Sequence, residues 1–246
     1  TFYKAWYFKG LAQLGMGDIK GAEKSLNRSS YSSTWYAVAH LELAQLAASQ
    51  NHLERAMEHI ERSIRSNGDN SRAYAVKALI LNRLGRYDEA LKTALEVQAI
   101  DPLDFFSLAQ QMMALKKSGT GKDEVNRVVK ALMKLTRRDS ENHIELALCF
   151  ARCGNYKEAA FILNMLTGES GKTTVSPLVY YYQAYYLHLT GEEKESDALR
   201  EKGSEVSAKY CFPNRLESFP VLEWAIARNP EDARAYYLLG SLYKSR

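Results

Sequence analysis

The stretch with the clearest potential for chemistry is GESGKTT, residues 168–174. A glycine-rich turn that ends in Gly-Lys-Thr resembles the end of a phosphate-binding loop, whose backbone N–H groups surround the phosphates while the lysine and the hydroxyl reach the terminal phosphate and its magnesium ion. That motif needs an earlier glycine at position 166, which is Leu166 here. It must also follow a strand and open a helix. The flanking pattern instead predicts a helix over 156–167 and another that starts at Pro177, so we expect a loop between helices and no nucleotide site.

The cysteines and histidines form no recognisable metal-binding or catalytic set. Cys149 and Cys153 are four residues apart and could offer two thiolates to zinc, but a structural zinc site needs four ligands. Small residues at a helix contact explain both cysteines better. No serine, histidine and acid combination stands out. We therefore predict no enzymatic activity, no metal and no cofactor. The five histidines are His40, His52, His59, His143 and His188.

Composition is that of an ordinary globular protein, with 46% hydrophobic and 25% charged residues among 246. The formal net charge is only +4, from 33 basic and 29 acidic residues, which is too balanced to indicate a nucleic-acid or membrane partner. No run of about eighteen apolar residues predicts a membrane span. The three cysteines give no disulfide framework and favour a reducing compartment such as the cytoplasm. Because the chain begins with Thr1 and not methionine, we expect a fragment of a longer protein.

One segment, residues 71–104, shows how the chain is organised: SRAYAVKALILNRLGRYDEALKTALEVQAIDPLD. Its apolar positions recur three and four residues apart, as in helices. The small residues Ala78 and Ala90 stand where two helices of a hairpin approach, Gly85 permits the turn, and Pro102 ends the second helix. The segment resembles a tetratricopeptide repeat (TPR). The resemblance implies an all-α fold, a right-handed α-solenoid of helical hairpins.

The same spacing recurs along the chain. Ala22, Ala56 and Ala159 occupy the position of Ala90, and we expect all four to be buried in about thirteen helices. A last apolar helix without a polar cap again indicates a segment of a longer protein. We predict a single TPR array over 1–246, with units at 3–36, 37–70, 71–104, 105–139, 140–176 and 177–210, an irregular half-unit at 211–232 and the first helix of a further unit at 233–246.

The resemblance places the first helix of each unit on the concave surface of the array. In the segment 180–188, YYYQAYYLH, helical geometry puts Tyr181, Tyr185 and His188 on one face. We expect them to form an exposed strip, although packing between units is the alternative. Tyrosines combine an apolar ring with a polar tip, which suits binding of extended peptides or sugars. The other candidates for a ligand groove are Arg72, Asn82, Arg83, Arg152 and Tyr237.

These patterns predict a non-enzymatic TPR scaffold that binds a protein or peptide, or another domain of the same chain, through its concave surface. Tyr7 and Leu11 occupy groove positions of the first unit, where TPRs that bind chaperone tails carry polar residues, so we do not expect a terminal carboxylate as ligand. The alternative comes from residues 211–240, which resemble the TPR portion of large bacterial proteins that also carry a galactose-mutarotase-like β-sandwich region. In that case the chain would be an accessory helical module of a bacterial carbohydrate-active protein.

A basic helix face is the remaining surface feature. Arg127, Lys130, Lys134 and Arg138 recur at helical spacing, which suits either a solvated face or a contact with an acidic partner. Proteins that bind single-stranded nucleic acid stack bases on aromatic side chains, and aromatic residues are sparse on this face. We therefore do not expect a nucleic-acid partner or a membrane, and the pattern indicates no particular oligomeric state.

Overall fold

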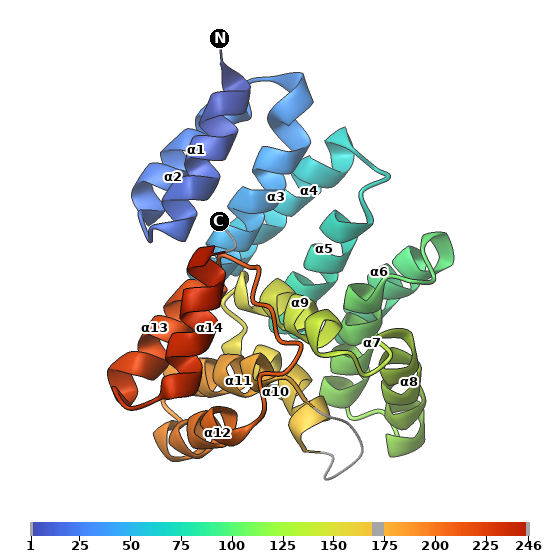
Figure 1. The fold of residues 1–246 in the computed structure, drawn as a ribbon. Coiled ribbons are helices and arrows are strands. Elements are labelled where there is room, and N and C mark those ends of the chain that lie inside the picture. Colours follow the sequence, from blue (N-terminus) through green and yellow to red (C-terminus); the bar gives the residue numbers. More distant parts are fainter. Residues whose placement is uncertain (1, 169–174, 245–246) are drawn as a thin grey trace. The chain divides into compact units, whose positions relative to one another are not determined.

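The computed structural model describes residues 2–168 and 175–244, and these contain helices and no strand (Figure 1). The predicted all-α fold is confirmed, with fourteen helices among the described residues. They are α1 (Tyr3–Gly15), α2 (Ile19–Ser29), α3 (Ser33–Ser49), α4 (Leu53–Ser66), α5 (Ser71–Arg83), α6 (Tyr87–Ile100), α7 (Phe105–Ser118), α8 (Lys122–Leu135), α9 (Ser140–Ala151), α10 (Tyr156–Thr167), α11 (Pro177–Leu189), α12 (Glu193–Glu205), α13 (Ser218–Arg228) and α14 (Ala233–Lys244).

Consecutive helices pair as hairpins, and in four of these pairs an alanine near the start of the second helix is buried. The side chains of Ala22, Ala56, Ala90 and Ala159 are all fully buried, as the repeat pattern predicted. A methyl group at this position lets two helix backbones approach closely, and a larger side chain would force them apart. The hairpins therefore follow from small residues at a fixed period.

The turns inside the first six hairpins, from α1–α2 to α11–α12, repeat the same backbone conformation. Each of these turns contains one residue with φ between 63° and 84°, a left-handed conformation that glycine adopts without steric cost. One position carries asparagine, the side chain that tolerates this conformation best after glycine. These residues are Gly17, Asn51, Gly85, Gly119, Gly154 and Gly191, spaced by 34 to 37 residues. The backbone thus shows the repeat period directly.

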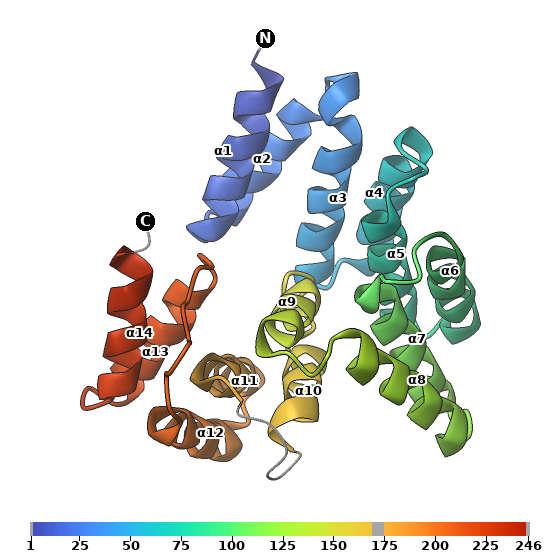
Figure 2. The ribbon, with the colours of Figure 1, turned by 45° about the vertical axis from the view of Figure 1, so that its right-hand side comes forward.

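The chain folds into two compact units. The first consists of residues 1–137 and 152–154. Within it α1, α3, α5 and α7 lie one beside the next, and α2, α4 and α6 each also contact the first helix of the following hairpin (Figure 2). This stacking buries a continuous apolar core, whose largest fully buried side chains include Leu43, Ile60, Leu79 and Met112.

The second unit consists of residues 138–151 and 155–246, and its described helices are α9 to α14. Here α11 is central, since it contacts α9, α10, α12 and α13. Helix α13 lies beside α11 and pairs with α14, which in turn contacts α12. The segment 211–217 before α13 is not helical, which agrees with the break in register seen in the sequence. The assignment of 211–232 to a half-unit stays a prediction.

None of the helices in the described residues combines the length and the apolar character that crossing a bilayer requires.

Candidate interaction surfaces

In the first unit, three polar side chains surround Glu42, which lies in the middle of α3. The Tyr7 hydroxyl of α1 forms a hydrogen bond with the Glu42 carboxyl. The guanidinium groups of Arg72, near the start of α5, and Arg152, in the turn after α9, attract the same carboxyl. Stacking of the hairpins thus assembles residues from widely separated parts of the sequence into one polar cluster. We call Tyr7, Glu42, Arg72 and Arg152 the Glu42 cluster.

The electrostatics of the Glu42 cluster are dominated by burial. Loss of water raises the pKa of Glu42, and this effect outweighs the two arginines and the Tyr7 hydrogen bond, which lower it. Burial, with the nearby Glu42 carboxyl, raises the pKa of Tyr7 to about 12. The Arg152 side chain remains exposed. The cluster therefore offers cationic and hydrogen-bonding groups at a partly buried position, which suits recognition of polar groups on another protein.

Asn82 and Arg83, two other groove candidates, hold helices together. Asn82 is only 5% exposed, and its amide nitrogen donates to the main-chain and side-chain oxygens of Gln110 in α7, both at 3.1 Å. Arg83 donates to the carbonyl oxygens of Ala48 at 2.6 Å and Cys153 at 2.7 Å. Ala48 lies in the last turn of α3, where carbonyls attract cations. The expectation of an accessible Asn82 is wrong because its side-chain amide donates hydrogen bonds to the buried Gln110.

In the second unit, the expected exposure of Tyr181 is also wrong. Its side chain is fully buried, and its hydroxyl donates to both carboxylate oxygens of Asp232, at 2.9 and 3.0 Å. Asp232 also accepts the N–H of Ala235 at 3.0 Å, so the tyrosine is tied to the start of α14. Burial, together with this hydrogen bond, raises the pKa of Tyr181 far above its usual range. Tyr181 is therefore a core residue and not part of an exposed strip.

Tyr185 and His188 share a face of α11 as predicted, but α13 covers part of it. Both rings pack on Trp224, Tyr185 edge-on at 5.6 Å and His188 nearly parallel at 5.3 Å between ring centroids. His188 also pairs with Glu193 at 2.7 Å. Both side chains are partly exposed, whereas Tyr237 on α14 is 55% exposed. A groove role for these three residues stays a prediction.

Sequence reasoning missed two residues of these surfaces. Glu42 is the only acidic residue in the helix STWYAVAHLELAQLAAS, and an isolated carboxylate in an apolar helix was the available signal. Trp224 follows the break in register, where the repeat pattern no longer predicts which helices meet. The role of both residues can be recognised once it is known which helices pack against one another.

The absence of a metal site and of a nucleotide site stays a prediction. Within 2–168 and 175–244, no group of three or more histidine, cysteine or acidic side chains could hold a metal ion. Cys149, Cys153 and Cys211 are all buried. Most of the GESGKTT stretch, residues 169–174, lies outside the described residues, and the helices on either side are α10 and α11.

The family of the chain follows from the sequence models that match it. The model described as "Psidin, N-terminal TPR repeats region" matches residues 47–169, half of the chain. The chain belongs to the Psidin N-terminal TPR repeat family. General TPR models also match residues 3–32 and 220–243 of this Psidin-family chain. The repeat pattern in the sequence had therefore predicted the correct kind of fold.

Curated relatives and solved structures agree with this assignment. The N-alpha-acetyltransferase 25, NatB auxiliary subunit of Rattus norvegicus is 31% identical over 103 residues, which is 42% of this chain and 10% of the relative. The chain thus spans about a tenth of the length of such relatives. A TPR protein from Parabacteroides merdae has a TM-score of 0.51 at 16% identity and covers 99% of this chain and 93% of its own. PilF from Pseudomonas aeruginosa also reaches 0.51 at 16% identity, covering 81% and 89%.

These structural similarities show the fold alone, an α-solenoid of TPR hairpins. The TPR family models that match the sequence support a role as a protein-interaction scaffold.

Proposed function

We propose that this chain is a scaffold segment of an auxiliary subunit of an N-α-acetyltransferase, and that its first unit binds another subunit of that enzyme. The observation that carries the proposal is the match of residues 47–169 to the Psidin N-terminal TPR region. The relative at 31% identity is itself named as a NatB auxiliary subunit. An auxiliary subunit needs no catalytic groups of its own, so we assign the chemistry to the partner.

The Glu42 cluster is the proposed contact. The polar groups of Asn82 and Arg83 are used inside the unit. The guanidinium groups of Arg72 and Arg152 both act on the Glu42 carboxyl, whose pKa burial raises, and the Arg152 side chain is exposed. An acidic side chain or main-chain carbonyl of the partner could bind these guanidinium groups with charge-assisted hydrogen bonds.

Co-expression with the catalytic subunit tests this proposal. The chain and the NatB catalytic subunit from the same organism are purified together, and the complex is detected by size-exclusion chromatography. Arg72→Glu combined with Arg152→Glu should weaken the complex at least about tenfold, because two favourable charges become repulsive. Arg65→Glu, on the exposed last turn of α4, is the matched control and should leave the complex intact.

The outcomes separate the two parts of the proposal. If the folded wild-type chain forms no complex with the catalytic subunit, the auxiliary role is wrong for this segment. If the complex forms and the double variant binds as well as the control, the auxiliary role stands and the Glu42 cluster is not the contact. Circular dichroism of each variant establishes that the helices are intact.

The partly exposed Tyr185 and His188 and the exposed Tyr237 are proposed as a second contact for a peptide or for another domain of the same chain. Their support is that each is a wholly or partly exposed aromatic side chain, because aromatic side chains are enriched at protein interfaces. The role as an accessory module of a bacterial carbohydrate-active protein stays a prediction from residues 211–240.

A further inference from the structure

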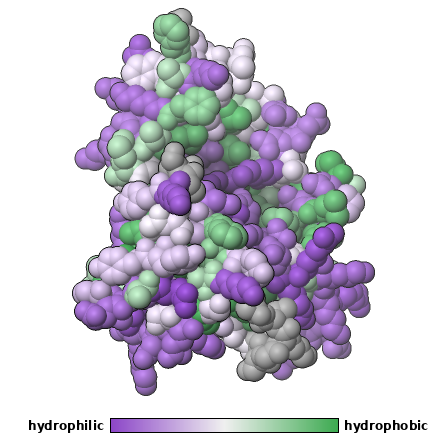
Figure 3. Space-filling model, in the orientation of Figure 1, coloured by the Kyte–Doolittle hydropathy of each residue, from purple (hydrophilic) through white to green (hydrophobic). Residues whose placement is uncertain are grey.

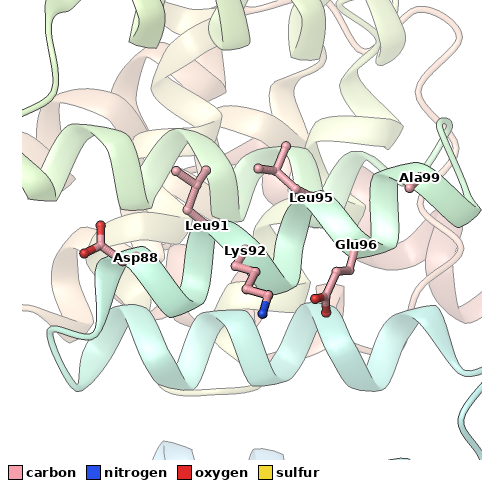
Figure 4. A pocket seen from close by; sticks show the side chains of 6 residues that line it. All are labelled: Asp88, Leu91, Lys92, Leu95, Glu96 and Ala99. Atoms are coloured by element: carbon pink, nitrogen blue, oxygen red, sulfur yellow. The ribbon is translucent and has the colours of Figure 1, made fainter.

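The outer face of α6 carries an apolar row that the hairpin does not bury. Leu91, Leu95 and Ala99 follow one another at four-residue spacing and line a shallow groove along the helix (Figure 4). Leu95 is 51% exposed, and just beyond the groove Ile100 and Leu103 are 72% and 70% exposed. In the space-filling view, hydrophobic surface is visible at the edge where Figure 1 places α6 (Figure 3).

The preceding hairpin shows that the fold does not require apolar residues at the exposed positions of this row. Helix α4 has the same place in the hairpin one repeat earlier, 34 residues back. There Glu61 replaces Leu95 and Arg65 replaces Ala99, whereas Met57, the counterpart of the half-buried Leu91, is apolar and buried. A solvated helix face normally carries such charges, and exposed apolar rows mark interaction sites. The exposed part of the row, Leu95 and Ala99, is therefore a feature of the α6 surface and not of TPR packing.

A second row on α6 consists of charges of alternating sign. Asp88, Lys92 and Glu96 also line the groove at four-residue spacing, and Lys92 and Glu96 point to the side opposite Leu91 and Leu95 (Figure 4). Within the described residues, neither Lys92 nor Glu96 takes part in an ion pair. The two rows together offer an apolar strip with a charged edge.

We propose that this face binds α6 of a second copy of the chain, so that two chains associate through antiparallel α6 helices. A two-fold axis at the height of Ala94 places Lys92 of each copy opposite Glu96 of the other, which gives two ion pairs across the interface. The two-fold axis leaves the charged flank of both helices on one side of the interface and the apolar flank on the other. The charged row of one copy therefore meets the charged row of the second copy. This inference goes beyond the proposed function and does not depend on it.

The same register also interlocks the apolar rows. Positions along the helix axis follow from a rise of about 1.5 Å per residue. In this register the apolar side chains of one copy lie, along that axis, between the apolar side chains of the other copy. An axis at the height of Lys92 would interlock the rows equally well, but it would place Asp88 opposite Glu96 and Lys92 opposite itself. Like charges in contact are unfavourable, so the charge pattern selects the register at Ala94.

The expected dimer is weak, because one helix face is smaller than the roughly 800 Å² per partner of a standard stable interface. Sedimentation velocity of the 246-residue chain over a concentration series should show a monomer–dimer equilibrium with a dissociation constant on the order of 10 to 100 μM. High salt should weaken it, because the ion pairs lie at the edge of the interface.

Charge exchange gives the sharpest test. Lys92→Glu and Glu96→Lys should each raise the dissociation constant about tenfold, since each places like charges opposite one another twice. The chain carrying both changes restores opposite charges and should dimerise within about threefold of the wild type. Leu95→Glu should abolish dimerisation, whereas Glu61→Lys at the matched position of α4 should have no effect.

Two results would overturn the proposal. One is a wild-type chain that stays monomeric at all concentrations up to about 0.5 mM, well above the expected dissociation constant. The other is a dimer that withstands Leu95→Glu or that the double charge exchange does not restore. All these positions are solvent-facing or only partly buried, so the variants should keep the helical circular dichroism spectrum of the wild type, and this is measured alongside.

Discussion

Gly154 is the position where the backbone geometry makes the strongest demand on residue type. Its φ is +74°, and a Cβ atom added there would lie 2.9 Å from the Cα and 3.0 Å from the carbonyl oxygen of Ser49. Both contacts are with backbone atoms at the end of α3, which cannot rotate away as a side-chain tip could. Alanine at this position therefore meets two separate penalties, one from the conformation and one from the contact.

The two penalties have different magnitudes and can be separated. A left-handed conformation costs a non-glycine residue about 1 to 2 kcal/mol. Forcing the turn away from α3 should add about 1 to 3 kcal/mol, as overpacking of an interior does. We therefore expect Gly154→Ala to lower the free energy of unfolding by about 2 to 5 kcal/mol in total.

Gly85→Ala is the matched control, because Gly85 has a φ of +75° and no atom within 4 Å of the added Cβ. It should cost only the conformational part, about 1 to 2 kcal/mol. Urea unfolding followed by circular dichroism measures both variants against the wild type. Equal losses for the two variants would refute the close contact between Gly154 and α3, and no loss in either would refute the left-handed turns.

Three further predictions concern buried groups. Burial, and to a smaller extent the nearby His59 and Arg62, lowers the pKa of His40 to about 4, and burial also lowers the pKa of His59. Because the unfolded chain binds protons below pH 6.5 that the folded chain does not, urea unfolding should show full stability above pH 6.5 and a loss of about 2 kcal/mol by pH 5. A chain with leucine at both histidines should not show this loss. Tyr181→Phe leaves a buried carboxylate without its hydroxyl donor and should lower the free energy of unfolding by about 1 to 3 kcal/mol, whereas unchanged stability would contradict the hydrogen bond. Ala90→Leu should cost about 1 to 3 kcal/mol through overpacking, and an unchanged melting temperature would contradict the repeat register.

The helices and their pairing could be predicted from the sequence because they depend on local rules. Apolar spacing of three and four residues gives the helices, and Ala90 with Gly85 gives the hairpin of residues 71–104. Tyr181 shows where such rules end. Helical spacing correctly places Tyr181 and Tyr185 near one face, but it cannot say that Asp232, about fifty residues later, will bury one of them. That depends on the packing of α13 and α14, which follow the break in register.

The candidate surfaces were predictable only in part for the same reason. Arg72 and Arg152 could each be selected as candidate groove cations, but only the stacked structure shows that both act on Glu42. Asn82 occupies an equally suitable position for a groove residue, yet its amide donates a hydrogen bond to Gln110 of α7. Position within a repeat thus identifies which residues can reach a groove. Whether they remain available depends on partners that lie in the next hairpin.

The contrast between α4 and α6 shows how one repeat can carry two kinds of information. Ala56 and Ala90 are equivalent and equally buried, because the hairpin needs a small residue there. Glu61 and Leu95 are equivalent too, but the hairpin places no demand on the outer face. A residue type that the fold does not require, and that solvent disfavours, needs another cause. In a repeat protein the preceding copy provides the comparison, so positions that differ from their counterparts in the direction of exposed apolar surface are the first places to search for a partner.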